Sequence, residues 1–226
     1  ETTMDWYPFI NSLRIALLAT IVVFFVGLAT AYYISRLPRL IKGMLDVILT
    51  LPLVLPPTVV GYFLICVFGP RHPVGALLAQ AGIQVAMHWY GAVLASAVVS
   101  FPLMYRTARG AFEAFDCSLR YAGQTLGLSN TYIFWHIVMP YCKTGILAGT
   151  VLAFARALGE YGATSMVAGY ISGKTATIST TVYQLWRIGD DRQAMFWVMV
   201  NLGISVVVLM AVNLLENSSK TRGAER

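Results

Sequence analysis

The segment from Leu119 to Pro140, "LRYAGQTLGLSNTYIFWHIVMP", is polar enough to lie in water, yet long apolar runs flank it on both sides. The 226-residue chain is 58% hydrophobic and 12% charged, with a mean hydropathy of +0.68. An ordinary soluble domain is only about 45–50% apolar. Because the apolar runs approach or reach spanning length, the composition indicates an integral membrane protein rather than a soluble one.

Five apolar stretches can supply membrane spans, since a helix of about 20 residues crosses the hydrocarbon layer and satisfies its own backbone hydrogen bonds there. They are Leu13–Ile34, Val47–Phe68, Trp89–Tyr105, Gly145–Leu158 with some of its flanks, and Phe196–Leu215. We therefore expect an all-α integral membrane protein, a bundle of about five transmembrane helices that forms a single domain over residues 1–226.

The positions of lysine and arginine predict the orientation of this bundle. Basic residues follow the first span, separate the third from the fourth, and follow the fifth: Arg36, Arg39, Lys42, Arg106, Arg109, Arg120, Lys143, Lys220, Arg222 and Arg226. The alternate loops carry fewer: Arg71, then Lys174, Arg187 and Arg192 against Asp190 and Asp191. The positive-inside rule puts the N-terminus outside and the C-terminus in the cytoplasm. Loop 106–143 is then cytoplasmic and loop 161–193 external.

Several functions are excluded or disfavoured by what the sequence lacks. It has no phosphate-binding loop and no nucleophile motif, so we expect a transport subunit rather than an enzyme. Cys66, Cys117 and Cys142 have no metal-ligand spacing and are expected to be free thiols, with no metal site. The basic pI near 9.3 follows from topology and needs no nucleic acid. The acidic N-terminal residues do not resemble the basic start of a cleaved signal peptide.

The opening segment carries the signals of two short helices. Ser118 can cap a first helix from about Leu119 to Leu126, and Gly127 can end it in the left-handed conformation. Ser129 or Asn130 can cap a second helix, "TYIFWHIV", which Pro140 closes or kinks. Together they would form a compact, rigid knob. From capping signals alone, a surface loop that merely connects two spans remains an alternative.

The spacing in this segment resembles the Glu-Ala-Ala loop of the membrane subunits of ABC importers. That loop runs Glu-Ala-Ala, three residues, Gly, nine residues, Ile-x-Leu-Pro, and Ala122, Gly127, Ile137 and Pro140 match it. Tyr121 replaces the usual Glu, Gly123 replaces Ala, and Met139 replaces Leu. In this family the loop docks on an ATPase, which implies coupling roles for Leu119, Arg120, Tyr121, Ala122, Gly123, Gly127, Leu128, Ser129, Tyr132 and Pro140.

Nearly the whole chain resembles one branch of that family. The stretches "LPLVLPPTVVGYFLICVFG", "GAVLASAVVSFPLMYRTARGAFEAF" and "AFARALGEYGATSMVAGYISGKTATISTTVYQLWRIGD" are similar to permease subunits of molybdate importers, within the molybdate, tungstate and sulfate group. The resemblance implies a homodimer in the lipid bilayer of a prokaryotic cytoplasmic (inner) membrane, together with two ATP-binding cassette ATPase subunits and an external oxyanion-binding protein. This chain would bind no cofactor itself, because ATP and Mg belong to the ATPase.

Two features of the spans suggest a translocation path. Pro52, Pro56, Pro57 and Gly61 interrupt the second apolar run, as happens where a helix lines a cavity, and also in simple packing kinks. Arg156 and Glu160 are four residues apart and can pair on one helix face. The pair either anchors the structure near the interface or lies beside the path. We assign to a path or gate Pro56, Pro57, Thr58, Gly61, Tyr62, Arg156, Glu160 and Tyr161.

Two kinds of transport protein therefore remain. The first is the ABC importer permease for molybdate, or for tungstate or sulfate. The second is a self-contained secondary carrier or channel for an anion. Carriers more often contain inverted repeats and protonatable residues at the membrane midplane. The sequence has no visible repeat, which favours the importer.

Overall fold

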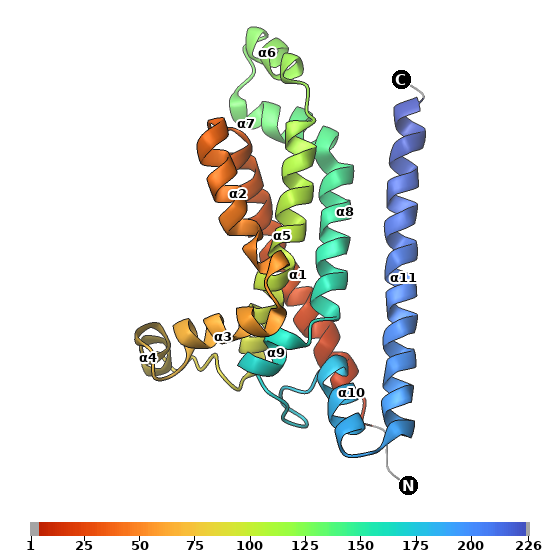
Figure 1. Cartoon of the computed structure of the whole chain (residues 1–226). Coiled ribbons are helices and arrows are strands. Elements are labelled where there is room, and N and C mark those ends of the chain that lie inside the picture. Colours follow the sequence, from red (N-terminus) through yellow and green to blue (C-terminus); the bar gives the residue numbers. More distant parts are fainter. Residues whose placement is uncertain (1–4, 225–226) are drawn as a thin grey trace.

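The computed structural model describes residues 5–224 and is helical over most of that range (Figure 1). The elements in chain order are α1 (Tyr7–Ser35), α2 (Arg39–Val54), α3 (Pro57–Phe68), α4 (Pro73–Gln80), α5 (Trp89–Glu113), α6 (Cys117–Thr125), α7 (Asn130–Ile133), the π-helical segment η1 (Phe134–Val138), α8 (Met139–Leu158), α9 (Gly162–Val167), α10 (Ile178–Arg187) and α11 (Asp191–Ala224).

The long helices are mutually parallel or antiparallel and give the molecule two ends (Figure 1). The N-terminus, the start of α5, the end of α8 and the start of α11 lie at one end, which we call the N-terminal end. The start of α2, the end of α5, α6 and the C-terminus lie at the other, which we call the α6 end. The segments predicted to share one side of the membrane thus share one end of the molecule.

Within the described part of the chain, four helical stretches are long and apolar enough to cross a membrane: α1, α5, Asn130–Leu158, and the Asp191–Ala211 part of α11. The α2–α3 pair supplies a fifth crossing if it is counted as one span. The expectation of about five spans is confirmed in this sense. The pair is bent by 111°, however, so the second apolar run is not one continuous helix.

The bend in the second run has a local cause. Leu55 and Pro56 both have extended backbones, with ψ of 141° and 135°. Each of them precedes a proline, and the proline ring disfavours the helical conformation in the residue before it. The chain therefore leaves α2 at Leu55 and starts α3 at Pro57, where the missing N–H costs no hydrogen bond.

Small side chains let the central helices α1, α5 and α8 approach closely. A Cβ added at Gly27 of α1 would lie 3.0 Å from Cγ of Met104, and one at Gly149 of α8 would lie 3.0 Å from Cβ of Thr107. Such small residues are typical of helix contacts in membranes. Met104 and Tyr105 of α5 are completely buried at the centre of this core.

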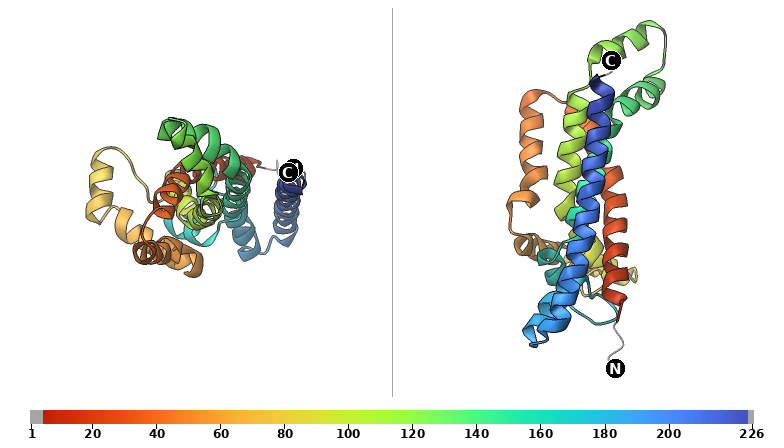
Figure 2. Two further views of the ribbon diagram at one scale, coloured as in Figure 1. Left: turned by 90° about the horizontal axis from the view of Figure 1, so that it is seen from above. Right: turned by 90° about the vertical axis from the view of Figure 1, so that its right-hand side faces the viewer.

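The remaining helices flank that core. Seen from above, α3 and α4 lie on one side and α11 on the opposite side (Figure 2). Large apolar side chains of α11 are exposed between Met195 and Leu214, including Met199, Val207 and Met210. Residues 161–193 were expected to form a loop, but they contain α9 and α10. The pattern of apolar and polar residues in this stretch did not predict these two helices.

Candidate functional site

The polar segment between the third and fourth apolar stretches forms two short helices, α6 and α7, at the α6 end (Figure 1). The carboxylate of Asp116, not Ser118, caps α6: its Oδ1 accepts a hydrogen bond of 2.8 Å from the backbone N–H of Ser118. The prediction of Ser118 as the cap was wrong because the helix begins two residues earlier than expected. The same N–H keeps the pKa of the Asp116 carboxyl below its ordinary value.

Gly127 ends α6 as predicted, with a φ of +77°. The N–H of Leu128 donates to the carbonyl of Gly123, and the N–H of Gly127 donates to that of Gln124. These two bonds form a Schellman motif, which requires a left-handed residue at the position of Gly127. Ser129 then caps α7, where its Oγ accepts from the N–H of Tyr132.

The two helices pack closely through a glycine. A Cβ at Gly123 would lie 3.1 Å from Cγ1 of Ile133, closer than most such contacts. Ala122, Tyr121 and Tyr132 are exposed, Leu128 is partly buried, and Arg120 lies with its guanidinium carbon 5.8 Å from the Phe115 ring. We call α6, α7 and the turn between them the knob, residues 117–133.

The knob has an exposed apolar surface. Tyr121 is 64% exposed and Leu126 is 79% exposed, and Leu119 and Tyr132 are also exposed. Trp135, just beyond the knob, is 58% exposed. Leu126 and Trp135 were not among the predicted residues, although large apolar side chains in a polar segment were a signal that could have found them.

Pro140 neither closes nor breaks the helix that follows the knob. The residues Asn130–Leu158 form one continuous helical stretch, in which the π-helical turn η1 ends at Val138, two residues before Pro140. In η1 the N–H of Met139 donates to the carbonyl of Phe134, five residues back. The wider turn accommodates a proline that has no N–H to donate. The knob is therefore joined rigidly by helix to α8.

The predicted path residues of α3 lie against α9. A Cβ at Gly61 would lie 2.8 Å from Cβ of Met166 and 2.9 Å from Cα of Ala163, and one at Gly162 would lie 2.8 Å from Cβ of Pro57 and 3.1 Å from N of Thr58. The backbones of α3 and α9 thus touch. Pro56, Thr58 and Tyr62 are exposed.

Arg156 and Glu160 pair at the end of α8, with 2.6 Å between Nη1 and Oε2. The Glu160 side chain is 1% exposed and that of Arg156 is 30% exposed. Oε1 of Glu160 also accepts a hydrogen bond of 2.8 Å from the N–H of Ala163, at the start of α9. The ring of Tyr161 lies 5.3 Å from that of Tyr183 on α10. One carboxylate therefore links α8 to α9 and balances the charge of Arg156.

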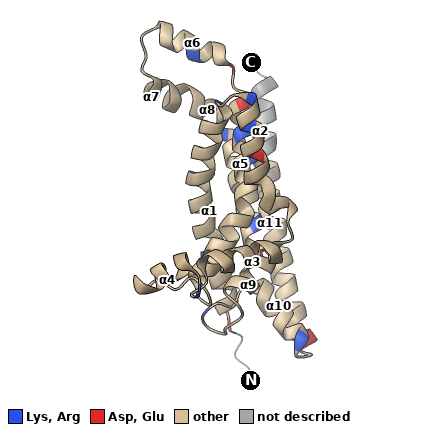
Figure 3. Ribbon diagram, turned by 60° about the vertical axis from the view of Figure 1, so that its left-hand side comes forward, with Lys and Arg blue, Asp and Glu red and all other residues tan. Residues whose placement is uncertain are grey.

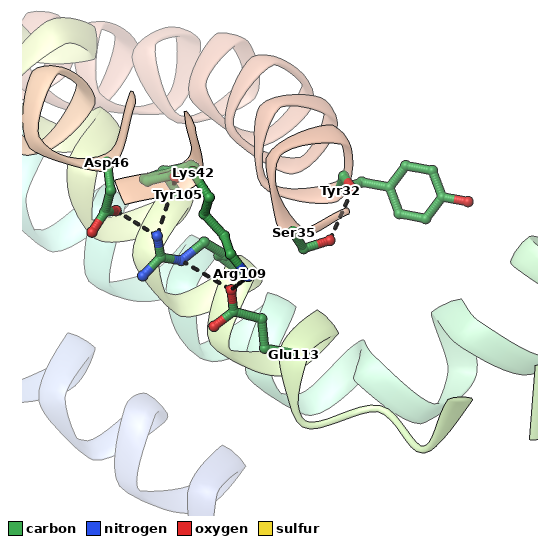
Figure 4. Close-up of polar contacts among 7 residues, drawn as sticks. All are labelled: Tyr32, Ser35, Lys42, Asp46, Tyr105, Arg109 and Glu113. Atoms are coloured by element: carbon green, nitrogen blue, oxygen red, sulfur yellow. Dashed lines mark hydrogen bonds and ion pairs between the residues drawn. The ribbon is translucent and has the colours of Figure 1, made fainter. Parts of the chain in front are cut away.

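A second group of charged residues joins α2 to α5 (Figure 4). None of its members was predicted as a site residue. Nη1 of Arg109 lies 2.7 Å from Oδ1 of Asp46, and Nζ of Lys42 lies 3.0 Å from Oε1 of Glu113. Arg109 Nε is 3.8 Å from the same Glu113 oxygen. Lys42 and Asp46 are four residues apart in α2, and Arg109 and Glu113 are four apart in α5. This i,i+4 spacing of opposite charges could have predicted the group from the sequence.

Charged residues gather in a few places on the molecule (Figure 3). Basic and acidic residues lie on the upper part of α2 and α5, and further basic and acidic residues lie at the turn between α10 and α11. The long faces between these groups carry few charges, as expected for surfaces in lipid.

The chain matches the family model described as binding-protein-dependent transport system inner membrane component over residues 11–215. It is 39% identical over 223 residues to the molybdenum transport system permease protein ModB of Escherichia coli K12, covering 98% of this chain and 97% of that one. It is 39% identical over 206 residues to a putative molybdenum transport system permease protein of Bacillus subtilis, covering 91% of each. A probable sulfate transport system permease protein of Chlorokybus atmophyticus is 32% identical over 209 residues, covering 92% of this chain and 73% of that one.

Two solved structures have the same fold. A chain of the MetNI methionine ABC transporter superposes with a TM-score of 0.69 at 13% identity, covering 92% of both chains. A chain of a bacterial ABC transporter for alginate gives a TM-score of 0.70 at 18% identity, covering 95% of this chain and 78% of that one. The chain belongs to the inner membrane components of binding-protein-dependent ABC transporters, the multi-pass, non-catalytic permease subunits that work with a separate ATPase and a binding protein.

Proposed function

We propose that this chain passes molybdate, or a similar tetrahedral oxyanion, from an external binding protein to the cytoplasm, driven by ATP hydrolysis in a partner chain. The observation that carries the proposal is 39% identity to a molybdenum permease over 98% of the chain. Two copies of the chain and two ATPase subunits would form the transporter. The N-terminal end would face outward and the α6 end the cytoplasm, in agreement with the positive-inside rule.

The knob is the proposed contact with the ATPase. A coupling element has to transmit a movement of the ATPase without bending, and it needs an apolar surface for docking. The knob has both properties, because the Schellman motif and the Gly123 contact fix its two helices and because Leu119, Tyr121 and Leu126 are exposed. Its helical connection through η1 to α8 supports a transfer of that movement toward Arg156 and Glu160.

The contact of α3 with α9 is the proposed wall of the path. Its glycine-mediated packing brings Thr58 close to the link that Glu160 makes between α8 and α9. Arg156 is the proposed cation beside the path. Because Glu160 already balances its charge, an anion would meet a weakly positive surface and could leave again.

The decisive experiment is uptake of labelled molybdate into liposomes that contain this chain, its ATPase and its binding protein. We expect uptake that requires both ATP and the binding protein, with tungstate and sulfate as competitors. Stronger competition by sulfate than by molybdate would assign the system to sulfate, in line with the 32% identity to a sulfate permease. Uptake without ATP would contradict the importer and support a secondary carrier or channel.

A further inference from the structure

A cavity of about 390 Å³ lies at the N-terminal end, far from the knob. We call it the N-terminal pocket. It is lined by the start of α1, by the residues before α5 and by the loop between α9 and α10, including Tyr7, Met87, His88, Trp89, Ile171 and Lys174. Its walls are mainly aromatic and aliphatic.

Three side chains from one face of α1 fix the loop that carries Lys174. The hydroxyl of Tyr7 donates to the carbonyl oxygen of Lys174 at 2.6 Å, and Nδ2 of Asn11 donates to that of Ala176 at 2.9 Å. Oγ of Ser12 accepts from the N–H of Ile178 at 2.8 Å. Asn11 and Ser12 are buried, so these bonds are sheltered from water. The backbone of Lys174 is therefore held rigidly at the rim of the pocket.

The opposite wall also has a constrained backbone. Met87 has a φ of +59°, a conformation that costs a non-glycine residue free energy and that is concentrated at functional sites. The N–H of Met87 donates to the carbonyl of Val167 at 2.9 Å, which ties this wall to the end of α9. Both walls of the pocket are thus fixed before any partner arrives.

The charges around the pocket are predominantly positive. Lys174 lines it, and the guanidinium carbon of Arg14 lies 3.8 Å from the centre of the Trp89 ring. Asp5 is the nearby acid, and its Oδ1 accepts a hydrogen bond from the N–H of Tyr7. Among residues 5–224, no carboxylate forms an ion pair with Lys174.

We infer that the N-terminal pocket receives a carboxylate-bearing side chain of the external binding protein, with Lys174 pairing the carboxylate. The inference rests on the proposed function, which puts this end outside. An acidic side chain with an aliphatic stem matches apolar walls beside an ammonium group. A free tetrahedral dianion fits less well, because the walls offer it little to replace its hydration.

The test measures docking of the purified binding protein on the complex of this chain with its ATPase in lipid nanodiscs, where both faces are accessible. We expect Lys174→Gln to weaken docking about tenfold and Lys174→Glu about a hundredfold, since placing like charges together costs several kcal/mol. Lys174→Arg should remain within about threefold of the wild type. The matched control is Arg192→Glu, the same charge reversal at the same end but outside the pocket, and it should change docking less than about threefold.

A zero-length carbodiimide crosslink identifies the partner atom directly. We expect the wild-type complex to give a peptide in which Lys174 is joined to an aspartate or glutamate of the binding protein. Lys174→Arg should abolish this crosslink while docking persists, because a guanidinium does not react. Size-exclusion chromatography of each variant checks that the complex is intact.

Four results would overturn the inference. The first is unchanged docking of the binding protein by Lys174→Glu, and the second is equal weakening of docking by Lys174→Glu and Arg192→Glu. The third is a crosslink from Lys174 to a second copy of this chain. The fourth is that a Lys174 variant of the complex loses molybdate binding but still docks the binding protein. Docking that depends on Lys174 in a system that fails to import molybdate would leave the inference standing and refute only the proposed substrate. A wild-type complex that does not bind the protein at all would refute both.

Discussion

Single residues hold this permease together where its helices change direction. Glu160 accepts one hydrogen bond from Ala163 and pairs with Arg156, so it serves two elements with one carboxylate. The two members of the pair differ in exposure, because the Glu160 side chain is almost completely buried and that of Arg156 is not. Loss of the acid removes both links, whereas loss of the base leaves the link to α9.

We therefore expect Glu160→Ala to lower the thermal stability of the assembled complex more than Arg156→Ala does. Breaking a buried ion pair costs about 3–5 kcal/mol in either variant. Arg156→Ala leaves the carboxylate with its hydrogen bond from Ala163, whereas Glu160→Ala also leaves the buried N–H of Ala163 without that acceptor. Glu160→Gln should fall between the two, since its amide oxygen can still accept from Ala163. Thermal unfolding in detergent gives the order, and a more damaging Arg156→Ala would contradict the assignment.

The charged group between α2 and α5 gives a second comparison. Asp46 is the nearer partner of Arg109, at 2.7 Å against 3.8 Å for Glu113, and its side chain is less exposed, 24% against 37%. We expect Asp46→Asn to destabilise the protein by about 1–2 kcal/mol, between the values for buried and exposed pairs. Glu113→Gln should cost less. Equal effects in thermal unfolding would show that the distances do not reflect the strength of the pairs.

At the scale of elements, the contact between α3 and α9 depends on a glycine. Gly61→Ala places a methyl group 2.8 Å from Cβ of Met166 and close to the Ala163 backbone, so α3 has to move. We expect a loss of stability of about 1–3 kcal/mol and slower anion uptake. Gly43→Ala in α2 is the control, because nothing lies within 4 Å of its added Cβ and alanine favours a helix. Similar unfolding curves for both variants would refute the close contact.

The knob is the element whose proposed role is easiest to isolate. Gly127 has a φ of +77° and open space around it, so Gly127→Asp costs about 1 kcal/mol of strain without a clash inside the chain. We expect the variant to insert and assemble its spans, while ATP hydrolysis no longer drives uptake or the ATPase dissociates. Gly189→Asp is matched in φ and in free space but lies at the other end, and it should transport normally. Normal transport by Gly127→Asp would reduce the knob to a connector.

Elements were predictable from the sequence where a local signal dominates. The left-handed Gly127, the cap at Ser129 and the Arg156–Glu160 pair follow from residue type and spacing alone. Pro140 does not close the helix, because a π-turn, which no residue type predicts, accommodates its missing N–H. The 111° bend between α2 and α3 and the packing of α3 on α9 depend on contacts between distant segments, and the proline pair indicated only that a break would occur.

At the scale of the whole molecule, the two ends offer different chemistry to different partners. The α6 end presents an apolar knob, and the N-terminal end presents a fixed pocket with Lys174 at its rim. α8 connects them, since it is continuous with the knob at one end and bears Arg156 near the other. This arrangement places the two proposed docking sites at opposite ends of the chain that the anion would cross.

The orientation of these ends is open to a direct test by cysteine labelling. Cys66, Cys117 and Cys142 are first replaced by alanine, and a single cysteine is then placed at Asn130 in the knob or at Ser172 in the loop before α10, both of which are exposed. An impermeant thiol reagent applied to intact cells should label Ser172→Cys at once, because the positive-inside rule puts that loop outside. Asn130→Cys should react only after the membrane is permeabilised. The reverse pattern would put the knob outside, where no ATPase could reach it, and would remove the proposed coupling role together with the proposed site for the binding protein.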